Sequence, residues 1–176
     1  MSQDFPEGKL TFRFPDDWHI CRPESTSYYS RHFQNFCGGC REMDFVAFDP
    51  NNLTLWFIEV KDYDANSRTK QQNLADEVSI KTRDVLALLP VGGIRDNAIS
   101  QPGHLQVRDF WQSARQATSM RVVLHCELPA STSKLFPGVK DSANLQTKLS
   151  QALRCVDPHP LFTHRGMGHA LPWVVN

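Results

Sequence analysis

The pattern of apolar and polar residues predicts a β-hairpin as the most regular element of the chain. Two β-rich runs within residues 44–61 (DFVAFDPNNLTLWFIEVK) flank the turn sequence DPNN at 49–52. The second run is apolar at consecutive positions, which predicts a central strand covered on both faces. Shorter runs at 9–14 and 18–21 predict two further strands ahead of the hairpin.

Helical spacing replaces this pattern after the hairpin. Apolar residues recur on one face from 66 to 89, which predicts a long helix capped by Asn66 or Ser67 and ended by Pro90 with the glycines that follow. Strands that alternate with helices predict a three-layer α/β domain with a mixed central sheet flanked by helices on both sides. The other expected elements are a short helix over 25–33, a loop over 94–106, a helix over 107–118, a strand over 120–128 and a helix capped by Asp141 over 141–153.

The length and composition of the chain indicate one domain that spans residues 1–176. There is no apolar run of the roughly 20 residues that a membrane span needs, and the N-terminus has no apolar signal core. We therefore expect a cytoplasmic protein with no membrane partner. Five cysteines are expected to be free thiols, and the Cys37-x-x-Cys40 pair is interpreted as a turn because no second ligand pair follows it.

The charge of the chain gives no general attraction for a polyanion. Nineteen basic residues balance nineteen acidic ones, so the formal net charge is zero. This balance argues against avid non-specific binding to nucleic acids, but a local basic groove stays compatible with it.

The hairpin brings three charged residues together at the end of an apolar strand. Glu59 and Lys61 share a face because residues two apart in a strand point to the same side. With 49–52 as the turn, Phe48 pairs with Leu53, and Asp44 becomes the diagonal neighbour of Glu59, with Cβ atoms roughly 7 Å apart. Two carboxylates at this separation can share one cation.

Burial of these charges predicts a metal site. An isolated charge in an apolar setting is unfavourable by several kcal/mol unless it is paired or binds a metal. Carboxylates of Asp44 and Glu59, with the backbone carbonyl of Val60, suit Mg²⁺, for which Mn²⁺ can substitute. Lys61 can orient a metal-bound water or neutralise charge on a phosphoryl transition state.

The arrangement of Asp44, fourteen intervening residues and then Glu59-Val60-Lys61, followed by a helix, resembles the PD-(D/E)xK nuclease superfamily. The resemblance covers about residues 24–128 and implies a restriction-endonuclease-like αβββαβ core, with 129–176 as an extension that carries the last helix and a strand. It also implies that Asp44 and Glu59 ligate the metal and that Lys61 positions the attacking water.

Several positions depart from or extend this resemblance. Met43 stands where the superfamily name places proline, and Glu24 is the candidate for an additional acid near the first helix. The candidates for an accessory group on the helix after the motif are Gln72, Glu77 and Lys81, although the last two are also spaced as a solvated ion pair. Blocks such as DFVAFDP and LWFIEVKDY resemble small stand-alone bacterial members of the superfamily.

These residues predict a metal-dependent nuclease that hydrolyses phosphodiester bonds, of DNA rather than RNA. Two alternatives stay open: a non-catalytic binding or immunity protein on a nuclease-like scaffold, and a phosphodiesterase for small phosphates. A homodimer or another protein partner is also compatible with the chain. In the simplest interpretation Glu59 and Lys61 are only the polar end of a strand and His125 is a core histidine.

Overall fold

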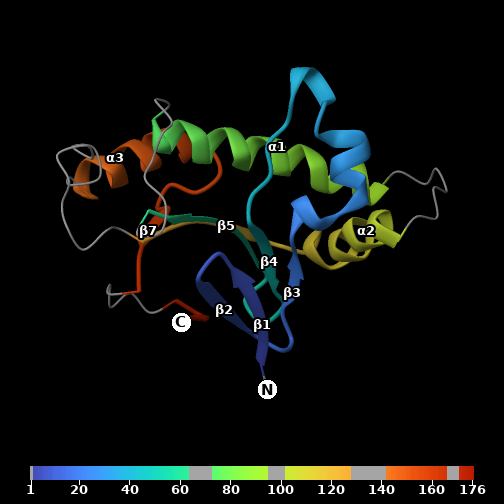
Figure 1. Ribbon diagram of the computed structural model, residues 1–176, viewed down its shortest axis with the longest axis horizontal. Coiled ribbons are helices and arrows are strands. Elements are labelled where there is room, and N and C mark those ends of the chain that lie inside the picture. The colour runs from blue at the N-terminus through green and yellow to red at the C-terminus, as the bar shows by residue number, and fades with distance from the viewer. Residues whose placement is uncertain (1, 64–72, 95–101, 128–141, 166–170) are drawn as a thin grey trace.

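A mixed five-stranded sheet forms the centre of the computed structural model (Figure 1). Its strands are β3 (His19–Cys21), β4 (Phe45–Asp49), β5 (Thr54–Asp62), β6 (Ser119–Glu127) and β7 (Leu161–Thr163). They lie side by side in chain order, with β4 antiparallel to both neighbours and β5, β6 and β7 parallel to one another. The structure describes residues 2–63, 73–94, 102–127, 142–165 and 171–176. The predicted mixed α/β architecture is confirmed.

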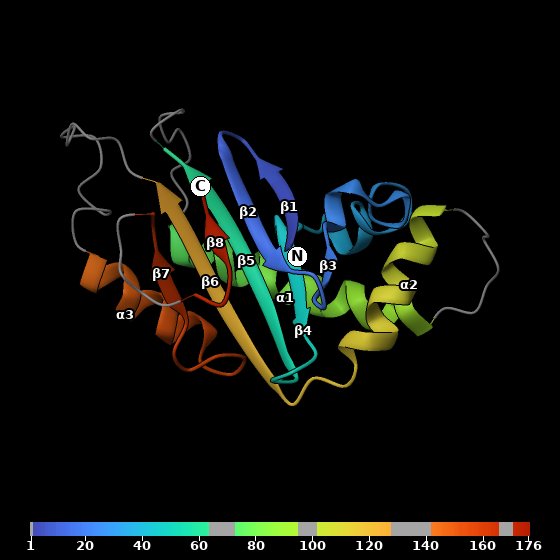
Figure 2. The ribbon, with the colours of Figure 1, turned by 90° about the horizontal axis from the view of Figure 1, so that it is seen from below.

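Helices cover one face of this sheet and a smaller sheet covers the other (Figures 1 and 2). Val46 and Phe57 pack toward the helices, whereas Phe45 and Ile58 pack toward the smaller sheet. The expectation of helices on both faces is therefore wrong for the described residues, because alternating apolar residues of the N-terminal strands supply the second outer layer. The helices are α1 (Leu74–Ile94), α2 (Pro102–Ala114) and α3 (Ser142–Leu153), and the smaller sheet contains β1 (Ser2–Glu7), β2 (Leu10–Pro15) and β8 (Val174–Val175).

The segment between β3 and β4 contains only short helical turns. The helix predicted over 25–33 is reduced to the single π-helical turn η2 (Tyr29–Phe33), preceded by the 3-10 turn η1 (Pro23–Ser25) and followed by the 3-10 turn η3 (Phe36–Gly38). Tyr29 and Phe33 share a face as expected and are buried against α1 and α2. This packing holds the turns on the helical side of the sheet.

Helix α1 continues past the proline that was expected to end it. Pro90 lies inside the helix, which extends to Ile94. Asn73 caps its start, since the Asn73 side-chain oxygen accepts a hydrogen bond from the Ala75 N–H at 2.9 Å. The caps predicted at Asn66 and Ser67 lie outside the described residues.

The close crossing of α1 and α2 explains why the glycines after Pro90 lie within the helix. A Cβ atom at Gly93 would lie 2.0 Å from Cδ1 of Trp111 on α2, and one at Gly92 would lie 2.6 Å from Cγ1 of Val107. The two glycines therefore serve helix packing and not helix termination. Pro90 by itself did not mark the end of the helix.

We expect Gly93→Ala to lower the free energy of unfolding by up to about 2 kcal/mol. Alanine is favoured over glycine in a helix by about 1 kcal/mol, but an overpacked methyl group against Trp111 typically costs about 1–3 kcal/mol. Urea unfolding measures the difference. Val91→Ala, in the same turn at a half-exposed position, is the control and should change stability little; an equally stable Gly93→Ala variant would contradict the packing argument.

The later elements follow the predicted order with shifted bounds. Helix α2 begins at Pro102 and not at 107, so the loop expected over 94–106 is wrong for 102–106. Strand β6 and helix α3 lie within about one residue of expectation, although the Asp141 cap is outside the described residues. Among the described helices, none is both long and apolar enough to cross a membrane.

Candidate functional site

The register of the β4–β5 hairpin places Asp44 opposite Glu59. Phe48 pairs with Leu55, and Phe45 pairs with Ile58. The expected pairing of Phe48 with Leu53 is wrong by two residues, since the turn occupies 50–53. A shift of two residues leaves every side chain on its expected face. Continued by one residue, the observed register makes Asp44 the direct neighbour of Glu59 and not the diagonal one.

A hydrogen bond to the backbone of β5 fixes Asp44. Asp44 Oδ2 accepts a hydrogen bond from the Val60 N–H at 2.6 Å. Asp44 also acts on Glu59 through charge, because its carboxylate contributes to the raised pKa of Glu59. The predicted meeting of the two acids at the end of the hairpin therefore occurs, and it is anchored through Val60.

Glu59 lies at the centre of a network that joins β5 to α1. Its Oε1 atom is 2.5 Å from Lys61 Nζ and 2.6 Å from Lys81 Nζ. Lys61 Nζ is also 3.1 Å from Glu77 Oε1. Both glutamates are completely buried, and both lysines are largely buried. Two acids and two amines from separate elements thus share one enclosed position.

The interpretation of Glu77 and Lys81 as a solvated ion pair is wrong. Glu77 is 0% exposed, and Lys81 reaches across to Glu59 on β5. Helix α1 begins beside the end of β5, so its first two turns present these side chains to the sheet. The sequence spacing of four residues was compatible with both arrangements, and only the docking of α1 distinguishes them.

Burial and charge shift the pKa values of this network in a coherent way. Loss of solvent, reinforced by the nearby Asp44 carboxylate, raises the pKa of Glu59 to about 7 despite the two lysines. Burial disfavours the Lys61 ammonium, but the carboxylates of Glu59 and Glu77 outweigh this effect and raise the pKa of Lys61. Lys61 therefore stays charged at neutral pH, and Glu59 titrates near it.

In metal-free buffer, we expect the stability of the wild type relative to Glu59→Gln to fall as the pH rises from about 4.5 to about 7. The folded-state pKa of Glu59 lies above its ordinary value, so in this window the folded state holds a proton that the unfolded chain has released. The shift corresponds to at most about 3 kcal/mol. Urea unfolding of both proteins at several pH values measures it, and a pH-independent difference would contradict the burial of the charge.

A second charged group lies at the margin of the site. Arg22 Nη2 is paired with Glu7 on β1 and is 3.0 Å from Glu24 Oε1 on η1. Burial and the Asp44 carboxylate raise the pKa of Glu7, so Glu7 and Asp44 are electrostatic neighbours. Glu24 therefore lies near the site but is exposed and bound to Arg22. No pattern in the sequence indicates a role for Glu7 or Arg22, because the β1–β2 hairpin brings Glu7 to the site only in three dimensions.

The donor atoms suit a single hard cation held by two carboxylates. Within the described residues, Glu59 Oε2 is buried and makes no hydrogen bond, while the Asp44 carboxylate is close enough to raise the pKa of Glu59. The described part of the chain contains no group of three or more His, Cys, Asp or Glu side chains arranged for a metal. Mg²⁺ usually takes one or two protein carboxylates and keeps several waters, so the pair Asp44 and Glu59 fits its needs. Gln72 lies outside the described residues.

Other polar residues singled out in the sequence have structural partners. His125 is buried and its Nε2 lies 2.9 Å from Glu127 Oε1, in agreement with a core histidine. Burial lowers the pKa of His125 and favours the neutral ring. Cys37 and Cys40 are free thiols around two glycines with positive φ, as a turn would require.

Comparison with known proteins gives a partial similarity. A cysteine–tRNA ligase of Neisseria meningitidis (serogroup A / serotype 4A) is 29% identical over 170 residues. The match covers 79% of this chain and 23% of the ligase, so the chain spans less than a quarter of that relative's length. No family model and no solved structure matches the chain.

Proposed function

We propose that this protein is a metal-dependent nuclease in which Asp44 and Glu59 hold Mg²⁺, with Mn²⁺ as a substitute. The observation that carries the proposal is the buried Glu59 Oε2, which makes no hydrogen bond within the described residues and belongs to a carboxyl group close enough to Asp44 for the Asp44 charge to raise its pKa. A buried oxygen without a partner is unfavourable. Two neighbouring carboxylates favour a hard cation as that partner.

The residues around the carboxylates suit phosphodiester hydrolysis. When bound, the cation would polarise a phosphoryl oxygen and acidify a water molecule. Lys61, held between Glu59 and Glu77, orients the attacking water and stabilises negative charge that develops on the phosphate. Lys81 supplies a second ammonium group beside Glu59. The Val60 carbonyl is the proposed additional metal ligand.

We also assign the fold to a restriction-endonuclease-like core as part of this proposal. The β4–β5 hairpin leads to α1, and β6 then lies parallel to β5, which supports the ββαβ part of an αβββαβ core. Two features depart from that core. Strand β3 precedes the helical turn η2, and a β-sheet replaces the second helical layer.

Cleavage of a substrate panel tests the proposal. Purified protein is incubated with plasmid, linear, single-stranded and branched DNA, and with RNA, in Mn²⁺, Mg²⁺ or EDTA. We expect cleavage of at least one nucleic acid that requires the metal. Absence of cleavage throughout the panel, together with absence of Mn²⁺ binding by calorimetry, would overturn it.

The similarity to a cysteine–tRNA ligase adds tRNA to the substrates that we propose to test. That relative, by its name, joins cysteine to tRNA, and the matched region is less than a quarter of its length. Metal-dependent cleavage of tRNA in preference to DNA would redirect the proposed activity to RNA. Equal cleavage of tRNA and DNA would indicate that the protein recognises the phosphodiester and not the sugar.

A non-catalytic binding protein on the same scaffold is the second candidate. One observation favours it: Lys61 and Lys81 already neutralise Glu59 Oε1, so the charge of this carboxylate is balanced without a metal. Calorimetric titration with Mn²⁺ separates the two candidates. Binding heat that the wild type shows and an Asp44→Asn variant lacks would support the nuclease. Absence of binding heat for the wild type would support the binding protein.

A further inference from the structure

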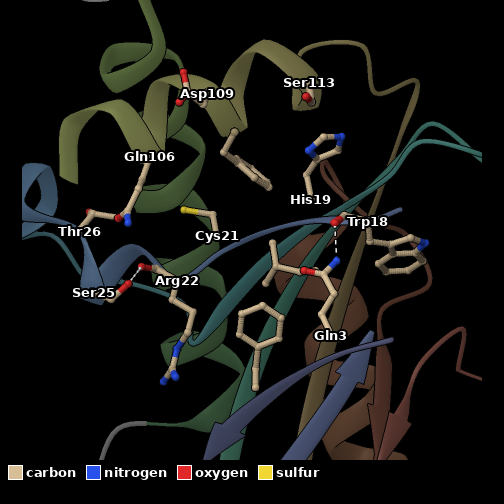
Figure 3. A pocket seen from close by; sticks show the side chains of 13 residues that line it. Gln3, Trp18, His19, Cys21, Arg22, Ser25, Thr26, Gln106, Asp109 and Ser113 are labelled. Carbon is tan, nitrogen blue, oxygen red and sulfur yellow. Dashed lines mark hydrogen bonds between the residues drawn. The ribbon is translucent and has the colours of Figure 1, made fainter. Parts of the chain in front are cut away.

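A trough along the edge of the central sheet is a second candidate binding site, which includes Arg22 from the margin of the first site but neither Asp44 nor Glu59. Its volume is about 610 Å³, and it is lined by β3, α2 and β1 (Figure 3). None of its lining residues comes from β4, the strand that pairs with β3. The trough therefore follows the side of β3 that faces away from the sheet.

The open edge of β3 can accept another strand. Among the described residues, β3 is the terminal strand of the five-stranded sheet and pairs only with β4 within that sheet. A terminal strand presents backbone N–H and C=O groups in the geometry that pairs with an added chain. An extended peptide bound in this way gains main-chain hydrogen bonds, and its alternate side chains enter the flanking spaces.

Helix α2 and strand β1 form the two walls of the trough. Gln106, Asp109, Phe110 and Ser113 line it from one face of α2, over a length of about 10 Å. About three residues of extended chain have this length. Strand β3 also contains three residues. On the other wall, Phe5 of β1 and Ile20 of β3 present partly exposed apolar surface.

The charges of the lining favour a peptide over a nucleic-acid strand. Arg22 is the one lysine or arginine among the described lining residues, and Glu7 and Glu24 already pair with it. Asp109 adds an exposed carboxylate on the α2 wall. A phosphate backbone depends on free basic side chains for its affinity, and the described part of this surface offers it none.

We propose that the trough binds an extended peptide of a partner protein, which adds to the edge of β3 as a further strand and places a basic side chain against Asp109. The alternation of side chains sets the chemistry of the peptide: apolar residues face Phe5 and Ile20, and the residues between them, basic or hydrogen-bonding, face α2. None of the proposed metal ligands lines the trough, so peptide binding there needs no metal and does not rest on the proposed nuclease activity.

Blocked hexapeptides with a fluorescent label test the proposal by anisotropy in EDTA. One alternates valine with lysine and the other alternates valine with glutamate. We expect the lysine peptide to bind more tightly to the wild type by about fivefold, the scale of one exposed ion pair. Asp109→Lys is expected to reverse this preference, and since Asp109 is exposed, the change leaves the core unaltered.

Two tryptophan substitutions on α2 locate the binding. Ser113→Trp fills the trough and should weaken both peptides at least tenfold. Gln112→Trp, at the neighbouring exposed position outside the lining, should leave both affinities unchanged. Circular dichroism confirms that each variant keeps its helix content. Two further versions of the lysine peptide carry N-methyl groups, one on the odd residues and one on the even residues, and test the backbone pairing. Alternate N–H groups of an added strand point toward β3, so only one of the two versions should lose binding.

Several results would overturn the proposal. The first is no binding of the lysine peptide up to about 1 mM, and the second is binding that Ser113→Trp leaves unchanged. Equal binding by both N-methylated peptides would exclude strand addition. Binding of oligothymidylate that Ser113→Trp abolishes would assign the trough to a nucleic acid, and self-association in sedimentation experiments that the same change abolishes would assign it to a second copy of this chain.

Discussion

Asp44→Asn should reduce metal-dependent cleavage by about 10³-fold and leave the fold intact. Asparagine keeps an oxygen that can accept the hydrogen bond from the Val60 N–H, so the local backbone geometry is preserved. It removes the charge that pairs with Glu59 around the proposed cation. Loss of one electrostatic group at a reacting centre typically reduces the rate by about 10²–10³-fold, and weaker metal binding adds to this loss.

Single-turnover cleavage at saturating Mn²⁺, with unfolding measured in parallel, provides the readout. The matched control is Asp76→Asn, which makes the same change at an exposed position in the first turn of α1, next to Glu77 in the sequence. This control should cleave within about twofold of the wild type. Full activity of Asp44→Asn in a pure preparation would remove Asp44 from the metal site.

Lys61→Ala should be among the most destabilising single substitutions in the chain. Lys61 contacts Glu59 and Glu77, and both carboxylates are completely buried. Removal of one partner from a buried ion pair costs about 3–5 kcal/mol, because the remaining charge stays out of water. We expect the loss to be larger at about pH 8 than at about pH 5, since Glu59 is neutral at the lower pH.

Chemical unfolding at these two pH values measures the effect. Lys148→Ala on the exposed face of α3 is the surface control and should change stability by less than about 0.5 kcal/mol. The variant that combines Lys61→Met and Lys81→Met with Glu59→Gln and Glu77→Gln should recover most of the stability, because it removes all four charges of the network and leaves none unpaired. A loss below about 1 kcal/mol for Lys61→Ala at both pH values would show that the network is solvated in solution.

The hairpin and the acids on it were predictable because local rules decide them. The turn signal at 49–52 and the period of two in a strand put Asp44 and Glu59 on one face, and an error of two residues in the register could not move either to the other face. The order of strands and helices after the hairpin was predictable for the same reason. Each depends on residues that are close in the sequence.

Contacts between distant segments decided the rest. Glu77 and Lys81 became part of the site because α1 packs against β5, and Glu7 approached Asp44 because the β1–β2 hairpin covers the other side of the sheet. Helix α1 passes Pro90 because Gly92 and Gly93 pack against α2. The sequence by itself thus determined which residues of one strand share a face. Only the tertiary structure decided which other elements enclose them. Burial and ion pairing arise between segments that are far apart in the sequence, and the local pattern of residues does not indicate which of these segments meet.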